Sequence, residues 1–150
     1  MNRLLVLPRV YLGVIFAVAV YGKITAPAAF TTHMTGFLNQ VALQDGFPWY
    51  QAFVRGVVLP HADVFATLVI AGETFVAISL LLGVATRLGA AVAILLLLNY
   101  ASGKGMLPWS PASNDWADIV LSLVVMAGAA GRTLGLDAWL HARYPRIGVS

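Results

Sequence analysis

Hydrophobic residues gather in four long runs along the chain, and polar residues or glycines lie at the ends of these runs. The runs cover residues 8–25, 63–86, 87–102 and 115–132. A helix of roughly 20 residues crosses a hydrocarbon core about 30 Å thick. The pattern therefore predicts an all-α fold, an integral membrane four-helix bundle formed by a single domain over residues 1–150.

The stretch between the first two runs is too long for a plain turn and has a helical periodicity of its own. An apolar row with spacing i, i+4, i+7, i+8 and i+11 consists of Phe30, Met34, Phe37, Leu38 and Val41. After a break at Asp45-Gly46, a second row consists of Trp49, Phe53 and Val57 and ends before Pro60. The rows predict two short amphipathic helices on the outer face of the bundle. Two interpretations are open: a lid over something between the spans, or interfacial packing.

Composition supports a membrane environment. Hydrophobic residues make up 60% of the chain and charged residues 10%, with a mean hydropathy of +0.85, whereas soluble domains carry about 25% charged residues. A domain of this size cannot bury so much apolar surface, which excludes a soluble globular protein and a disordered one. The lipid bilayer is the expected surrounding.

The net charge of +3 does not indicate nucleic acid, because the basic residues are scattered and form no basic stripe. The chain has no cysteine and therefore no disulfide or thiolate ligand. Its three histidines are not at ligand spacing, so no metal or haem site is expected. Any redox chemistry has to come from a bound cofactor or a partner.

The basic residues predict the orientation, since cytoplasmic loops carry an excess of Lys and Arg. With a cytoplasmic N-terminus the inner side holds Arg3, Arg9, Arg87, Arg132, Arg143 and Arg146, and the outer side holds Lys23, Arg55 and Lys104. We therefore expect both termini in the cytoplasm and the protein in the plasma (inner) membrane. The first run resembles a signal peptide with Ala17-Val18-Ala19 as its cleavage site, but its apolar character continues to Ile24, which predicts a retained span.

Several polar residues lie within or at the ends of the apolar runs. Glu73 is ten positions beyond Asp63 and thus about 15 Å deep at a rise of about 1.5 Å per residue. The others in the outer half are Tyr21, Lys23, Asn99, Tyr100, Asp118 and Ser122. A charge within a span costs at least about 2.5–3.5 kcal/mol and usually faces the interior of the bundle. The set is either an interhelical hydrogen-bond cluster or a pocket, and we expect Glu73 to meet Lys23, Asp118 or both.

Short motifs in these runs resemble the DoxX/DoxD family of small membrane proteins. They are Tyr21-Gly22-Lys23, Glu73 followed by Leu80-Leu81-Leu82-Gly83 and Thr86-Arg87, Asp118, and Gly131-Arg132 with Leu136-Asp137. Lys23, Glu73 and Asp118 match family positions. The resemblance implies a four-helix membrane bundle of bacterial or archaeal type. It also implies either a subunit similar to that of a thiosulfate:quinone oxidoreductase or an anchor for redox and oxidative-stress partners.

These features are consistent with three functions. The favoured one is a membrane redox subunit that binds a quinone in the polar pocket and works with a peripheral or soluble partner, because a chain without cysteine cannot pass electrons from a sulfur substrate unaided. The second is a non-catalytic scaffold for such a partner. The third is a small-molecule carrier, which would need a homo-oligomer and lacks the inverted repeat of many carriers.

Overall fold

The structure is a computed structural model that describes residues 2–110, 114–128 and 135–136. Within these residues every regular element is a helix. The six α-helices are α1 (Val6–Thr25), α2 (Pro27–Phe37), α3 (Pro48–Phe53), α4 (Ala62–Leu82), α5 (Thr86–Gly103) and α6 (Asp115–Ala127). The predicted all-α fold is therefore observed.

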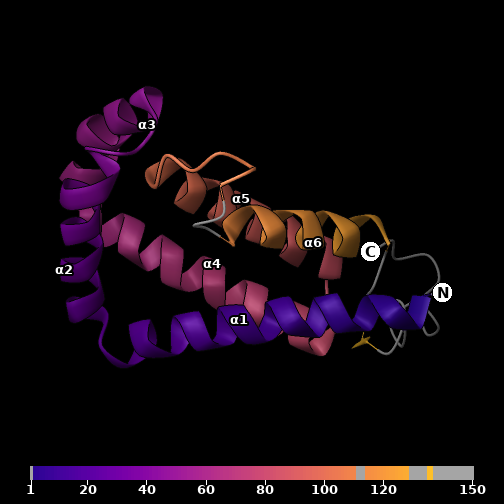
Figure 1. The fold of residues 1–150 in the computed structure, drawn as a ribbon. Helices are drawn as coiled ribbons and strands as arrows, with labels where there is room; N and C mark the ends of the chain where they lie inside the picture. Colours follow the sequence, from indigo (N-terminus) through magenta and orange to yellow (C-terminus); the bar gives the residue numbers. More distant parts are fainter. Residues whose placement is uncertain (1, 111–113, 129–134, 137–150) are drawn as a thin grey trace.

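The helices α1, α4, α5 and α6 run side by side, and α2 crosses their ends (Figure 1). Helix α1 packs on α4 and α6, and α5 packs on the same two helices. At the end opposite to α2, the buried Arg9 near the start of α1 lies against Gly83, which joins α4 to α5. The start of α1 and the α4–α5 turn therefore share one end of the molecule, and α2 and α3 lie at the other.

Within the described residues, three helices are long and apolar enough to cross a membrane. They are Val6–Thr25, Thr86–Gly103 and a continuous helical stretch of 35 residues, Pro48–Leu82. Helix α6 has 13 residues, and residues 129–132 at the end of its predicted span lie outside the described residues. The same holds for the motif Gly131-Arg132, for Asp137 and for the basic residues Arg143 and Arg146. The chain is an all-helical membrane protein with three membrane-capable helices in its described part.

The four packed helices share one hydrophobic core. Leu12 and Phe16 of α1 meet Leu80 of α4 in it, and Ile119 comes from α6. Helix α5 contributes small residues, among them the fully buried Ala93. Small residues let helix backbones approach closely, which is how helices pack in membranes where lipid competes equally for apolar side chains.

The turn between α4 and α5 is built from one glycine and one hydroxyl. Gly83 ends α4 with φ +65°, a left-handed conformation that glycine adopts without steric cost. The Ser79 hydroxyl donates to the carbonyl oxygens of Val84 at 2.7 Å and Ala85 at 3.2 Å. A side chain at Gly89 would collide with Ser79, so the glycine is what allows α5 to fold back against the end of α4.

Residues 27–61, which we call the lid segment, contain the two predicted amphipathic pieces. The first is α2 continued by a π-helical turn, Leu38–Ala42, and the second is α3 continued by another, Val54–Val58. The predicted break before Pro60 is wrong, because the chain stays helical through the 3-10 segment Leu59–His61 into α4. Pro60 lies in the first turn of that segment, where its missing N–H costs little.

The lid segment has a hydrophobic cluster of its own, distinct from the core of the packed helices. Its buried members are Leu38, Ala42, Tyr50, Val54 and Val58, from both amphipathic pieces. The two pieces therefore pack on each other as well as on the helices below, with α2 contacting α4 and α3 contacting α5. This arrangement allows space to remain between the lid segment and the helix ends.

Candidate functional site

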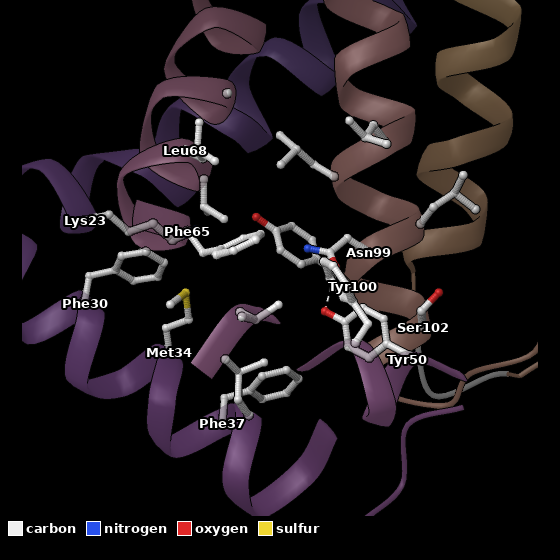
Figure 2. A pocket seen from close by; sticks show the side chains of 18 of the residues that line it. Lys23, Phe30, Met34, Phe37, Tyr50, Phe65, Leu68, Asn99, Tyr100 and Ser102 are labelled. Carbon is white, nitrogen blue, oxygen red and sulfur yellow. Dashed lines mark hydrogen bonds between the residues drawn. The ribbon is translucent and has the colours of Figure 1, made fainter. Parts of the chain in front are cut away.

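A cavity of about 810 Å³ lies between the lid segment and the helices α4 and α5 (Figure 2). Its wall is mainly aromatic and aliphatic. The lid segment contributes Phe30, Met34, Phe37, Leu38, Tyr50 and Phe53, and α4 and α5 contribute Phe65, Leu68, Val69, Val92, Leu95 and Leu96. The amphipathic pieces of residues 27–61 therefore line a cavity, as the lid interpretation expects.

One side of the cavity is bounded by an ion pair between α1 and α4. The Lys23 ammonium donates to both carboxylate oxygens of Glu73, at 2.5 and 2.6 Å. The Tyr100 hydroxyl on α5 donates to one of the same oxygens at 2.6 Å. Lys23 and Tyr100 line the cavity, while Glu73 lies directly behind them. Three helices thus converge on one carboxylate.

These three hydrogen bonds, from two donor groups, explain why a carboxylate is tolerated at this depth. The Glu73 side chain is 1% exposed and that of Lys23 20%, and a buried charge is costly unless it is paired and its oxygens are hydrogen-bonded. The Lys23 ammonium also lies 4.9 Å from the centroid of the Phe30 ring, a cation–π distance. Phe30 belongs to α2, so the lid segment packs on the ion pair.

A second polar contact closes the cavity between α3 and α5. The Tyr50 hydroxyl donates to the amide oxygen of Asn99 at 2.5 Å, and both residues line the cavity. The sequence did not indicate Tyr50 as a site residue. The candidates were polar residues within the four apolar runs, and Tyr50 lies in the lid segment. Nothing in the local sequence signals a partner 49 positions away.

The structure divides the seven residues that sequence analysis selected into two sets. It brings together Lys23, Glu73, Asn99 and Tyr100, and the expected pairing of Glu73 with Lys23 is present. The Tyr21 side chain is 73% exposed and does not line the cavity. Two positions along a helix turn the side chain by about 200°, so Tyr21 faces away when Lys23 faces inward.

Asp118 and Ser122 also lie away from the cavity. The expectation that Glu73 meets Lys23, Asp118 or both is met by Lys23, and among the described residues no hydrogen bond or ion pair joins Asp118 to Glu73. Helix α6 packs mainly on α5 and α1, not on α4. Ser122 donates its hydroxyl to the backbone carbonyl of Asp118 at 2.7 Å, a bond within one helix turn that leaves no role in the cavity.

Comparison with known proteins gives one match. A family model described as DoxX matches residues 4–101, more than half of the chain. The matched region includes α1, the lid segment, α4 and nearly all of α5, and therefore every residue that lines the cavity except Ser102. No curated protein and no solved structure matches the chain.

Proposed function

The chain belongs to the DoxX family, and we propose that it is a membrane subunit of a redox system that binds a quinone or a similar neutral, lipid-soluble molecule. In this proposal α1, α4, α5 and α6 form a four-span bundle with both termini in the cytoplasm. The cavity then lies in the outer half of the membrane. The observation that carries the proposal is an apolar cavity that ends at a polar cluster without net charge.

The size of the cavity supports a ligand of this class. Pockets for small molecules and cofactors are typically about 300–1,000 Å³ and mostly apolar, with a few polar groups that fix the orientation. The cavity of about 810 Å³ falls in this range. Its aromatic wall suits a flat ring, since aromatic rings stack at centroid distances of about 4.5–7 Å.

The charge of the polar cluster favours a neutral head group over an anion. The Lys23 ammonium is already neutralised by Glu73, so a fatty-acid carboxylate would have to compete with a buried partner that holds two hydrogen bonds to the same ammonium. A quinone carbonyl needs only a donor. Lys23 has three ammonium protons and donates to two oxygens, and Asn99 supplies an amide N–H₂ group.

A bound quinone would supply a two-electron, two-proton couple. In this proposal Glu73, Lys23 and Tyr100 hold and move the protons of that couple. Glu73 accepts hydrogen bonds from the Lys23 ammonium and the Tyr100 hydroxyl, and both of these residues line the cavity. The chain has no cysteine and hence no thiol couple of its own. We propose that a peripheral or soluble partner exchanges the electrons.

Filling the cavity is expected to remove the bound quinone. A Cβ atom at Gly72 meets the side chains of Leu96 and Val92 at ordinary contact distances of 3.4–3.8 Å, and both residues line the cavity with Gly72, so the ring in Gly72→Phe is expected to fill part of it. Wild-type protein, purified from membranes in mild detergent, should carry quinone in near-stoichiometric amount. The variant should carry less by at least about tenfold, a loss of about 1.4 kcal/mol in binding. Solvent extraction and chromatography quantify the quinone.

Gly36→Phe is the matched control, because a Cβ atom at Gly36 meets nothing within 4 Å and the residue does not line the cavity. It should keep the wild-type amount of quinone. Wild-type protein that carries no quinone and takes up no added decylubiquinone would overturn the proposal, and a scaffold for a partner protein would then be the better account.

A further inference from the structure

The hydrogen bond from Tyr50 to Asn99 fixes the orientation of a side chain that lines the cavity. We infer that Tyr50 is a positioning residue that holds the Asn99 amide with its nitrogen towards the cavity, so that Asn99 donates to a carbonyl oxygen of the bound molecule. Asn99 would thereby select neutral ligands that carry such an acceptor. This inference rests on the proposed function and adds a specificity determinant to it.

Three of the donor groups around the cavity are engaged with other protein groups, and the side chains of His33, Trp49 and Ser102 also line it. Tyr100 donates its only hydroxyl proton to Glu73, and Lys23 donates twice to the same carboxylate. Tyr50 donates its only hydroxyl proton to Asn99. Among the described residues the Asn99 amide makes no other hydrogen bond, so both of its N–H groups are available.

Tyr50 is well placed to hold the amide in one orientation. Its side chain is 5% exposed and belongs to the hydrophobic cluster of the lid segment. Its ring packs against the rings of Trp49 and Phe53, with centroids 5.6 and 6.1 Å away. On α5, Gly103 leaves room for the ring, because a Cβ atom there would lie 3.3 Å from it. The hydroxyl is thus held in place from both sides.

The position of the hydroxyl determines which end of the amide faces the cavity. A tyrosine hydroxyl that donates to the amide oxygen draws that oxygen towards α3. The Asn99 nitrogen then lies on the other side of the amide from the Tyr50 hydroxyl. A ligand carbonyl that enters the cavity meets an N–H donor there, whereas a ligand without an acceptor leaves it unsatisfied, which carries a desolvation cost.

Binding of decylubiquinone to the full-length protein in nanodiscs tests the inference, read out by affinity and by the carbonyl stretching band in the infrared spectrum. Asn99→Leu should weaken binding about tenfold, as expected for one hydrogen bond of about 1.4 kcal/mol. Its bound quinone should show the band of a carbonyl that has lost this hydrogen bond. Tyr50→Phe should weaken binding and broaden the band, because the amide then takes more than one orientation.

A double variant separates positioning from general damage to the lid segment. If Tyr50 acts through Asn99, Tyr50→Phe should change neither the affinity nor the band in the Asn99→Leu background. Tyr11→Phe, an exposed tyrosine outside the cavity, should behave as wild type. Wild-type protein that binds decylubiquinone with a carbonyl band unchanged by Asn99→Leu overturns this inference and leaves the proposed function standing. Wild-type protein that binds no quinone overturns both.

Discussion

Lys23→Met is expected to destabilise the protein by about 3–5 kcal/mol, because removing one partner of a buried ion pair leaves the other charge uncompensated. Here the survivor is the Glu73 carboxylate, which is 1% exposed. Tyr100 would remain as its donor through a hydrogen bond of 2.6 Å, but a hydroxyl does not neutralise the charge. Reversible unfolding in mixed detergent micelles, followed by circular dichroism, measures the loss.

A second ion pair among the described residues offers a matched control. Lys104 contacts Asp115 at 2.8 Å, but the two side chains are 35% and 14% exposed. Pairs that remain accessible contribute about 0–1 kcal/mol, so Lys104→Met should change the unfolding free energy by about 1 kcal/mol or less. An equal loss in the two lysine variants would contradict the burial argument.

A double variant tests whether the loss comes from the uncompensated charge. Lys23→Met with Glu73→Gln removes both charges and keeps a side chain that can accept from Tyr100. Replacing a whole buried pair by neutral groups is often nearly neutral for stability, so the double variant should regain most of what Lys23→Met loses. A double variant as unstable as the single one would mean that the lysine stem, not its charge, supports the fold.

Cysteine labelling of intact cells is expected to give an all-or-none difference between the two ends of the molecule. The chain has no cysteine, so a single substitution gives a clean signal. Gln44→Cys, at an exposed site between α2 and α3, should react with a membrane-impermeant maleimide. Val84→Cys, in the α4–α5 turn, should react only after the cells are permeabilised.

This expectation follows from the distribution of Lys and Arg in the sequence, where a cytoplasmic N-terminus puts six basic residues on the inner side and three on the outer side. Detection of the labelled protein on a gel, with total lysate as the loading control, gives the extent of reaction at each site. The opposite pattern would place the lid segment and its cavity in the cytoplasmic half and would move the docking side of a partner to the other face.

The depth of polar residues in the apolar runs was the informative signal in the sequence. It selected Lys23, Glu73, Asn99 and Tyr100, which the structure brings together. Depth does not give the direction of a side chain around the helix, and for this reason it also selected Tyr21, which faces outward. It also cannot say which helices are neighbours.

The positions of α6 and of Tyr50 illustrate that second limit. Asp118 has a suitable depth, but its helix packs on α5 and α1, so it does not reach Glu73. The hydrogen bond between Tyr50 and Asn99 joins residues 49 positions apart, and the periodicity of the lid segment reports only that one face is apolar. The amphipathic rows predicted the lid helices, whereas the cavity beneath them is a product of tertiary packing.

Photolabelling with an azido-substituted quinone tests most directly whether the cavity is the binding site. The probe is photolysed with protein in liposomes, and adducts are mapped by mass spectrometry. We predict adducts on cavity residues such as Phe30 and Met34, suppressed by excess decylubiquinone and by Gly72→Phe. Adducts confined to the exposed residues Val14 and Val18 of α1, or labelling that Gly72→Phe does not change, would contradict a quinone site in the cavity.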